Sequence, residues 1–318
     1  MAIDERIDRP GRRAFLQTLG ALSTGMGSLL AQTGANWKNH IGLEIYTVRD
    51  LLPKDFEGTV AKVAEMGYKE VEPVGYGDME PKQFRAMLDR YGLTAPSTHA
   101  GVTAGPDVEK QLEGQQIMGI KYTEVRSPAR PPAAPGAAKA PAKKGPARES
   151  EESVKRTAAQ LNEHGKLVKK FGMKILVHNH TQEFEKLEGS SLRPYDILLA
   201  ETDPELVAMQ LDIGWASVAG QNIIQMFQKN QHRFELWHVK DATGLKNMDQ
   251  SLSPNDRRKA SKLVPVGEGD IDYKAIFAKA GIAGMKHFCV EQDNAAEGGA
   301  DSLAAARTSF NNLKRILS

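Results

Sequence analysis

The chain has 318 residues, of which 40% are apolar, and a formal net charge of +2. This length suits either two domains or one large α/β barrel, and the small charge argues against nucleic acid as a partner. Cys289 is the only cysteine, which excludes an intramolecular disulfide and a thiolate zinc cluster.

Residues 1–35 have the pattern of an export signal. Gly11-Arg12-Arg13 precedes a moderately apolar run, 18–31, and small residues follow it. This pattern resembles a twin-arginine signal peptide, with cleavage expected after Ala31 or Ala35, and predicts a periplasmic or secreted protein. The run is too short and too rich in Gly and Ser to span a membrane, so no stable membrane insertion is expected. An amphipathic extension is the less favoured alternative.

From residue 40 onward, short apolar runs alternate with stretches of helical spacing. The expected strands are 41–47, 69–73, 93–99, 120–126, 174–179, 207–211, 234–239 and 286–291, and the expected helices are 56–66, 81–91, 107–118, 152–171, 195–202, 223–229, 273–280 and 300–316. Eight strand–helix pairs predict one α/β domain over residues 36–318, a (β/α)8 TIM barrel. A doubly wound open sheet is disfavoured because no G-x-G-x-x-G turn follows the first strand.

Two long segments interrupt the alternation on the side where the strands end. Residues 127–150 hold six of the sixteen Pro, with much Ala and Lys and no aromatic residue, and predict a disordered insertion. A lid over the site is the alternative for this segment. Residues 242–269 form a second, polar segment, and its position favours a loop that covers the substrate.

Carboxylates and imidazoles follow the last four expected strands. The segments are His178-Asn179-His180-Thr181-Gln182-Glu183, Gln210-Leu211-Asp212, Trp237-His238-Val239-Lys240-Asp241 and Val290-Glu291-Gln292-Asp293. Singly, such residues are more typical of helix caps or hydrogen-bonded core positions. Adjacent barrel strands lie about 4.8 Å apart, however, so four successive strand ends can point side chains at one ion. Oxygen and imidazole ligands suit Mn²⁺, Mg²⁺, Co²⁺ or Fe²⁺ better than a sulfur-seeking metal.

Together these segments resemble the sugar phosphate isomerase/epimerase family of xylose isomerase-like TIM barrels, from about residue 40 to residue 316. The resemblance is carried by the runs 42–49 (GLEIYTVR), 71–72 (VE), 178–184 (HNHTQEF), 212–215 (DIGW), 238–241 (HVKD), 267–272 (GEGDID) and 290–293 (VEQD). The H-N-H-x-x-E-F form at 178–184 resembles that of an exported subgroup.

The resemblance implies one divalent ion, with Mn²⁺ expected first, bound by Glu, Asp, His and Glu after strands five to eight. Three positions match the family pattern directly: Asp212, His238 and Glu291. Many relatives place Glu where this chain has His178, so we expect Glu183 to be the fourth ligand, with His178 or His180 as the alternatives.

The resemblance also implies proton transfer at a carbon next to a carbonyl, through a metal-stabilised enediolate. Glu183 and Glu291 are the expected catalytic pair, and Lys240 would stabilise developing negative charge. Contacts to substrate hydroxyls are expected from His99, Arg126 and His180. The expected protein is therefore a divalent-metal-dependent keto-sugar epimerase or isomerase with a small carbohydrate substrate, paired as a homodimer.

The main alternative is a lyase or hydratase that acts on 3-keto-glycosides by β-elimination. It is favoured by the expected export and by Trp215, which stands where several epimerases of the family have a substrate-binding His. A non-catalytic sugar-binding barrel is less favoured. A relative of the barrel endonucleases that cut DNA at abasic sites is least favoured, because the chain has no basic groove pattern.

Overall fold

The computed structural model describes residues 37–127 and 149–318. The expected export signal and residues 128–148 of the Pro-rich insertion lie outside this part, so both stay predictions. The chain divides into Met1–Asn39, of which only the 3-10 turn η1 (Trp37–Asn39) is described, and a compact unit, His40–Ser318.

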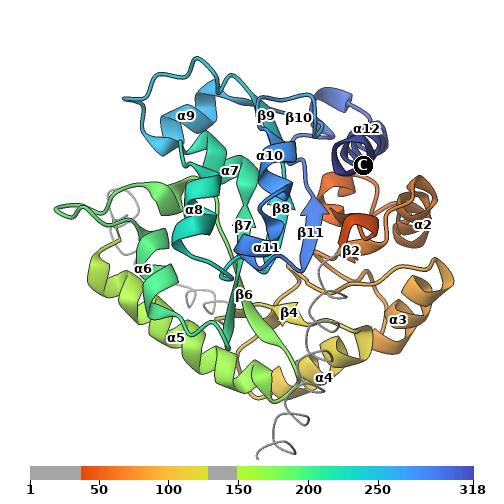
Figure 1. The fold of residues 1–318 in the computed structure, drawn as a ribbon. Helices are drawn as coiled ribbons and strands as arrows, with labels where there is room; N and C mark the ends of the chain where they lie inside the picture. The colour runs from red at the N-terminus through yellow and green to blue at the C-terminus, as the bar shows by residue number, and fades with distance from the viewer. Residues whose placement is uncertain (1–36, 128–148) are drawn as a thin grey trace, which may run out of the picture. The chain divides into compact units, whose positions relative to one another are not determined.

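Seven strands of the compact unit form one curled parallel sheet, which curves around the centre of the domain (Figure 1). In the order of the sheet they are β2 (Glu70–Glu72), β1 (Gly42–Glu44), β11 (His287–Val290), β8 (Leu236–Val239), β7 (Val207–Asp212), β6 (Lys174–His178) and β4 (Tyr122–Thr123). Two isolated parallel bridges, Glu70 with Thr94 and Ser97 with Tyr122, connect the two edges through residues 94–97. The structure thus confirms the predicted α/β barrel.

The expected third strand, 93–99, is the irregular position of the barrel. Pro96 has no backbone N–H to donate to a ladder, so regular pairing cannot run through it. Its carbonyl still accepts hydrogen bonds from the backbone N–H groups of Lys121 (2.7 Å) and Tyr122 (3.1 Å). Beyond this segment, the short strands β3 (Val102–Thr103) and β5 (Val125–Arg126) pair in parallel.

Helices surround the sheet, and most of them lie close to where the sequence predicts them (Figure 1). They are α2 (Phe56–Met66), α3 (Pro81–Arg90), α4 (Val108–Met118), α5 (Glu151–Lys169), α6 (Pro194–Glu201), α7 (Ile213–Val218), α8 (Ile223–Lys229), α9 (Pro254–Ala260), α10 (Tyr273–Phe277), α11 (Ala280–Ala283) and α12 (Ser302–Leu317). The start of α2 is capped by Asp55, whose side chain accepts from the Gly58 N–H, and Gly67 ends the helix at φ 108°.

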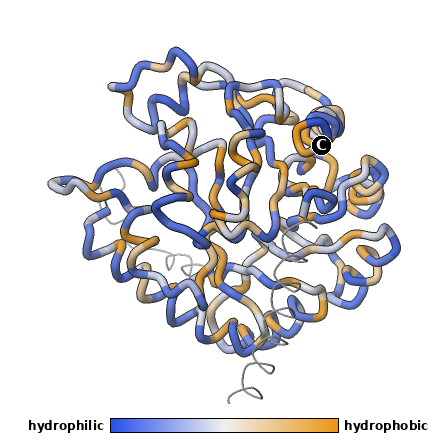
Figure 2. The backbone as a smooth tube through the Cα atoms, viewed as in Figure 1, coloured by the Kyte–Doolittle hydropathy of each residue, from blue (hydrophilic) through white to orange (hydrophobic). Residues whose placement is uncertain are grey.

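The central strands are largely hydrophobic, and the outer loops are mostly hydrophilic (Figure 2). Residues of β4, β6, β7 and β8 pack together inside the barrel: Tyr122, Leu176, Ala208 and Leu236. In the described part of the chain, no helix is both long and apolar enough to cross a membrane.

The polar segment after β8 is an ordered excursion rather than the simple loop that the sequence predicts. β9 (Asp241–Thr243) pairs antiparallel with β10 (Lys262–Val264), and α9 lies between the two strands in the sequence. Asp241 fixes the return of the chain, because its carboxylate accepts hydrogen bonds from the backbone N–H groups of Gly267 (2.9 Å), Gly269 (3.1 Å) and Ile271 (3.3 Å).

Candidate metal and sugar site

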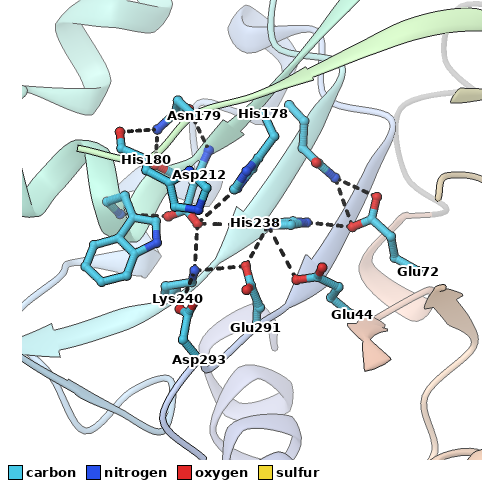
Figure 3. A network of polar contacts seen from close by, with 12 residues as sticks. Glu44, Glu72, His178, Asn179, His180, Asp212, His238, Lys240, Glu291 and Asp293 are labelled. Atoms are coloured by element: carbon cyan, nitrogen blue, oxygen red, sulfur yellow. Dashed lines mark hydrogen bonds and ion pairs between the residues drawn. The ribbon is translucent and has the colours of Figure 1, made fainter. Parts of the chain in front are cut away.

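Four side chains from neighbouring strand ends converge at the carboxyl end of the barrel (Figure 3). They are His178 at the end of β6, Asp212 at the end of β7, His238 in β8 and Glu291 directly after β11. One ligand atom from each lies within 4.8 Å of the others. The structure therefore brings together three of the expected ligands, Asp212, His238 and Glu291, and adds His178 as the fourth member.

Glu183, the expected strand-five ligand, lies outside this group. It belongs to the 3-10 turn η3 (Gln182–Phe184), and its Oε2 accepts a hydrogen bond from the backbone N–H of His180 at 2.8 Å. The last residue of a strand can point into the barrel, whereas five further residues and a turn carry Glu183 away. The imidazole of His178 occupies the strand-five position of the group instead, with its Nε2 3.3 Å from Asp212 Oδ2.

Glu72, at the end of β2, orients the imidazole of His238. Its Oε2 lies 2.5 Å from His238 Nε2, and both of its oxygens accept from the Gln210 side-chain amide, at 2.8 and 3.0 Å. With Nε2 held in this way, His238 Nδ1 faces the group, 2.8 Å from Glu291 Oε2 and 3.9 Å from Asp212 Oδ2. A carboxylate behind a ligating histidine is the usual support of a protein metal site.

The chemistry of this donor set fits a divalent cation. Two imidazole nitrogens and two carboxylate oxygens are ligands that zinc, manganese, iron and cobalt accept. Within the described residues, neither His238 Nδ1 nor Glu291 Oε2 makes a well-directed hydrogen bond, although the two atoms are close together. Both atoms are buried and lie 2.8 Å apart, so a bound cation would satisfy both of them.

The electrostatics of the group favour the ligand forms of two members, His178 and Glu291. Burial, followed by the nearby His238 and His99, lowers the pKa of His178 well below its usual value, which keeps that imidazole neutral. Burial would raise the pKa of Glu291, but Lys240 and His238 outweigh it and lower that pKa well below its usual value. A neutral imidazole and an ionised carboxylate are the forms that bind metal ions.

Lys240 lies beneath the carboxylates rather than in the cavity. It is fully buried, and its Nζ lies 3.0 Å from Asp212 Oδ2, 2.9 Å from Glu291 Oε2 and 2.6 Å from Asp293 Oδ2. These carboxylates outweigh the effect of burial and raise the pKa of Lys240. Lys240 thus compensates the charge of the acidic group, and its expected role in stabilising negative charge that develops on the substrate stays a prediction.

A small residue next to Asp212 allows this packing. A Cβ on Gly214, in the first turn of α7, would lie 2.5 Å from the carbonyl oxygen of Lys240. The glycine therefore permits close approach of α7 to the end of β8. The backbone N–H of Trp215 donates to Asp212 Oδ1 at 2.7 Å, and the Trp215 ring lies 4.8 Å from Lys240 Nζ.

A cavity of about 340 Å³ opens beside the four-residue group. Its walls contain three expected substrate contacts, His99, Arg126 and His180, together with Glu44, Tyr46, Val74, His178, Glu291 and Asp293. Polar side chains of this kind and a volume near the lower end of the range for ligand pockets suit a small polar molecule.

Two further hydrogen-bond networks fix the cavity wall. His99 Nε2 lies 2.8 Å from Gln210 Oε1, and the Arg126 guanidinium donates to Glu124 Oε2. Burial would lower the pKa of His99, but Glu72, Glu124 and Glu44 raise it to about 9.

Glu44, Glu72 and Asp293 are the site residues that sequence reasoning did not assign. Glu44 and Glu72 each end a short strand, which is the same signal that marked the assigned residues. Asp293 follows Glu291 by two positions, the spacing that returns a side chain to the same face of an extended chain. Of these three residues, Asp293 and Glu44 line the cavity, whereas Glu72 lies behind His238.

A closed parallel barrel with acidic and imidazole side chains in a cavity at its carboxyl end is the arrangement of the α/β barrel enzymes. The family model described as xylose isomerase-like TIM barrel matches residues 60–316. The chain belongs to this family.

Among curated proteins, the chain is similar to inosose dehydratases. The protein of that name from Clostridium perfringens (strain 13) is 31% identical over 132 residues, which cover 40% of this chain and 43% of the relative. The inosose dehydratase from Clostridium botulinum (strain Alaska E43) is 26% identical over 245 residues, 70% of this chain and 76% of the relative. The match thus spans less than half of the first relative and about three quarters of the second.

Solved structures share the fold at low identity. A sugar phosphate isomerase/epimerase from Parabacteroides distasonis has a TM-score of 0.61 and 21% identity over 89% of this chain and 97% of its own. The IOLI protein with a bound zinc atom has a TM-score of 0.57 and 13% identity, with coverages of 88% and 98%. An L-ribulose 3-epimerase has a TM-score of 0.57 and 12% identity, with coverages of 87% and 94%.

Proposed function

We propose that this protein is a metal-assisted lyase that removes a β-substituent, such as water or an alcohol, from a keto-sugar or a related cyclic keto-polyol. The observation that carries the proposal is the group His178, Asp212, His238 and Glu291, of which His178 and Glu291 line a small polar cavity. The names of the curated relatives support elimination over epimerisation.

The proposed reaction begins with loss of a proton from the carbon next to the carbonyl. Bound by the four-residue group, a divalent ion would polarise the carbonyl and offset the negative charge that develops on its oxygen. His99 and Arg126, held by Gln210 and Glu124, would orient the substrate through its hydroxyl groups.

The proton-transfer residues differ from the pair that the sequence suggests. Glu183 does not line the cavity, and Glu291 belongs to the ligand group. His180 lines the cavity without belonging to that group, and an imidazole can act as a general base. We therefore assign to His180 the removal of the α-proton.

Epimerisation or isomerisation of a keto-sugar is the second candidate. It begins with the same proton abstraction, and it is favoured by a cavity wall that carries proton-transfer groups at or after the ends of three strands: Glu44, His180 and Asp293. The two reactions differ in whether the β carbon–oxygen bond breaks.

The test follows both outcomes in one experiment. The purified protein is incubated in deuterated water with Mn²⁺ or Zn²⁺ and, separately, with methyl 3-keto-glucoside and inosose, and NMR follows the substrate. We expect deuterium exchange at the α carbon, release of methanol or water, an unsaturated ketone as product, and loss of these activities with a chelator. Exchange with inversion and no elimination would establish the epimerase instead, and the absence of exchange with either ketone would contradict both.

A further inference from the structure

Glu44 and His180 lie on opposite sides of the barrel. With residues 94–97 in third position, the closed order of the barrel is β1, β2, 94–97, β4, β6, β7, β8 and β11. In this ring of eight positions, β1 and β6 are four steps apart, which is the largest separation available. Glu44 ends β1, His180 follows β6 by two residues, and both line the cavity.

The carboxyl group of Glu44 is buried but uncommitted. The residue is only 4% exposed, and its Oε2 has no hydrogen-bond partner in the described parts of the chain. His238 Nδ1 lies 3.9 Å from this oxygen. A buried carboxyl oxygen without a partner is costly, and a hydroxyl group of a bound molecule would supply the missing hydrogen bond.

The other acidic side chains around the cavity are already engaged. Glu72 is held by His238 and Gln210, and Asp293 Oδ2 lies 2.6 Å from Lys240 Nζ. Asp212 and Glu291 contact the same lysine and belong to the four-residue group. Among the described carboxylates of this site, Glu44 is thus the one that lines the cavity without a lysine partner.

We propose that Glu44 is a catalytic residue that delivers a proton to the leaving oxygen of the substrate. The role assumes the proposed elimination. His180 takes the α-proton, and the electron pair of the C–H bond passes into the enolate of the ketone. The enolate carbonyl then re-forms, and the double bond between the α and β carbons forms as the β carbon–oxygen bond breaks. The leaving oxygen takes the proton of the Glu44 carboxyl group and departs as water or an alcohol. Exchange with solvent returns a proton to Glu44 and removes one from His180.

Placement on opposite sides of the cavity suits an elimination in which the two groups leave from opposite faces of the sugar ring. The proposed role of Glu44 also predicts that a poor leaving group needs a proton from Glu44 to depart, whereas a good leaving group does not. General acid catalysis typically contributes 10²–10⁴-fold to a rate. A p-nitrophenolate departs without protonation, so this contribution should disappear for it.

The experiment compares wild type with Glu44→Gln on methyl 3-keto-glucoside and p-nitrophenyl 3-keto-glucoside, with Mn²⁺ present. We expect elimination of methanol to fall at least about 100-fold, elimination of p-nitrophenolate to fall less than about threefold, and α-deuterium exchange and bound metal content to be retained. Glu44→Asp should restore part of the methanol rate. Glu163→Gln removes an exposed carboxylate of α5 (side chain 69% exposed) and should match wild type.

Each other outcome has a distinct meaning. If the variant retains the methanol rate, or loses both eliminations equally, Glu44 does not donate the proton. If the variant loses bound metal, its role is structural support of the four-residue group. If wild type itself eliminates neither leaving group, the proposed lyase function fails, and the role of Glu44 fails with it.

Discussion

The hydrogen bond between Glu72 and His238 decides which imidazole nitrogen faces the cavity. Burial would lower the pKa of the fully buried His238, but Glu72, Glu44 and Glu291 outweigh it and raise this pKa well above its usual value. Burial would raise the pKa of Glu72, but His238 and His99 outweigh it and lower this pKa to about 2. An ionised Glu72 therefore holds the Nε2 proton of His238, and Nδ1 is presented to the other ligands.

His178 and Glu183 give the sharpest comparison between single residues. We expect His178→Ala to weaken binding of Mn²⁺ or Zn²⁺ by more than about 100-fold, the upper end of what loss of a supporting residue alone costs. Glu183→Gln should leave the affinity within about threefold, because Glu183 bonds to the backbone of His180 outside the group. Competition with a chelating dye measures both affinities. The reverse order would make Glu183 the strand-five ligand.

At the level of elements, Asp241 connects the excursion after β8 to the barrel. Its two carboxylate oxygens accept from four backbone N–H groups, those of Ala242, Gly267, Gly269 and Ile271. A Cβ on Gly269 would lie 2.0 Å from Asp241 Oδ1, so the turn is built tightly around this side chain. The glycine run that the family resemblance includes thus has a structural role.

Replacing Asp241 tests this role. Asp241→Asn turns one acceptor oxygen into an NH₂ group, which cannot accept from the buried N–H groups that it faces. We expect the free energy of unfolding to fall by about 1–3 kcal/mol, the cost of an unsatisfied buried donor. Asp272→Asn is the matched control, because Asn replaces Asp well at a helix N-cap and should change stability by less than about 0.5 kcal/mol. Urea unfolding measures both, and equal effects would contradict the proposed role.

For the whole molecule, the two ends of the barrel have different polar groups. At the amino end, the Glu235 carboxylate accepts from Lys174 Nζ (2.6 Å), Lys286 Nζ (2.8 Å) and Tyr122 Oη (2.8 Å). These residues lie at or just before the starts of four parallel strands. Polar groups at this end of a barrel serve stability, whereas those at the carboxyl end serve chemistry.

Glu235 should make the stability of the barrel depend on pH. Burial raises its pKa, but hydrogen bonds from Lys174, Lys286 and Tyr122 outweigh burial and lower the pKa below its usual value of 4.5. Its contribution is therefore present above about pH 4.5 and is lost as the pH falls through the lower folded-state pKa.

We expect Glu235→Gln to lower the free energy of unfolding by about 1–3 kcal/mol at pH 7. The difference from wild type should shrink when the same urea titration is made at pH 3, because this pH lies below the usual pKa of 4.5 and unfolding then takes up a proton on Glu235. The exposed Glu163→Gln serves as control at both values. A difference that stays constant with pH would show that Glu235 acts only through packing.

The amino-acid sequence by itself determined the alternation of strands and helices, because apolar periodicity and end signals are local. The expected ranges 56–66 and 223–229 coincide with α2 and α8, and caps such as Asp55 and Gly67 are adjacent in sequence to what they terminate. It also located Asp212, His238 and Glu291 near strand ends, since each follows its own apolar run.

Only the tertiary structure decided which side chains share the cavity. Glu44 and Glu72 come from the first two strands and meet His238 only because the sheet closes on itself. His178 rather than Glu183 joins the group because the turn after β6 directs Glu183 to the backbone of His180. Lys240 turns toward three carboxylates because burial without them would be too costly. The positions of Glu44, Glu72 and Lys240 depend on contacts between residues distant in sequence, which no local pattern contains.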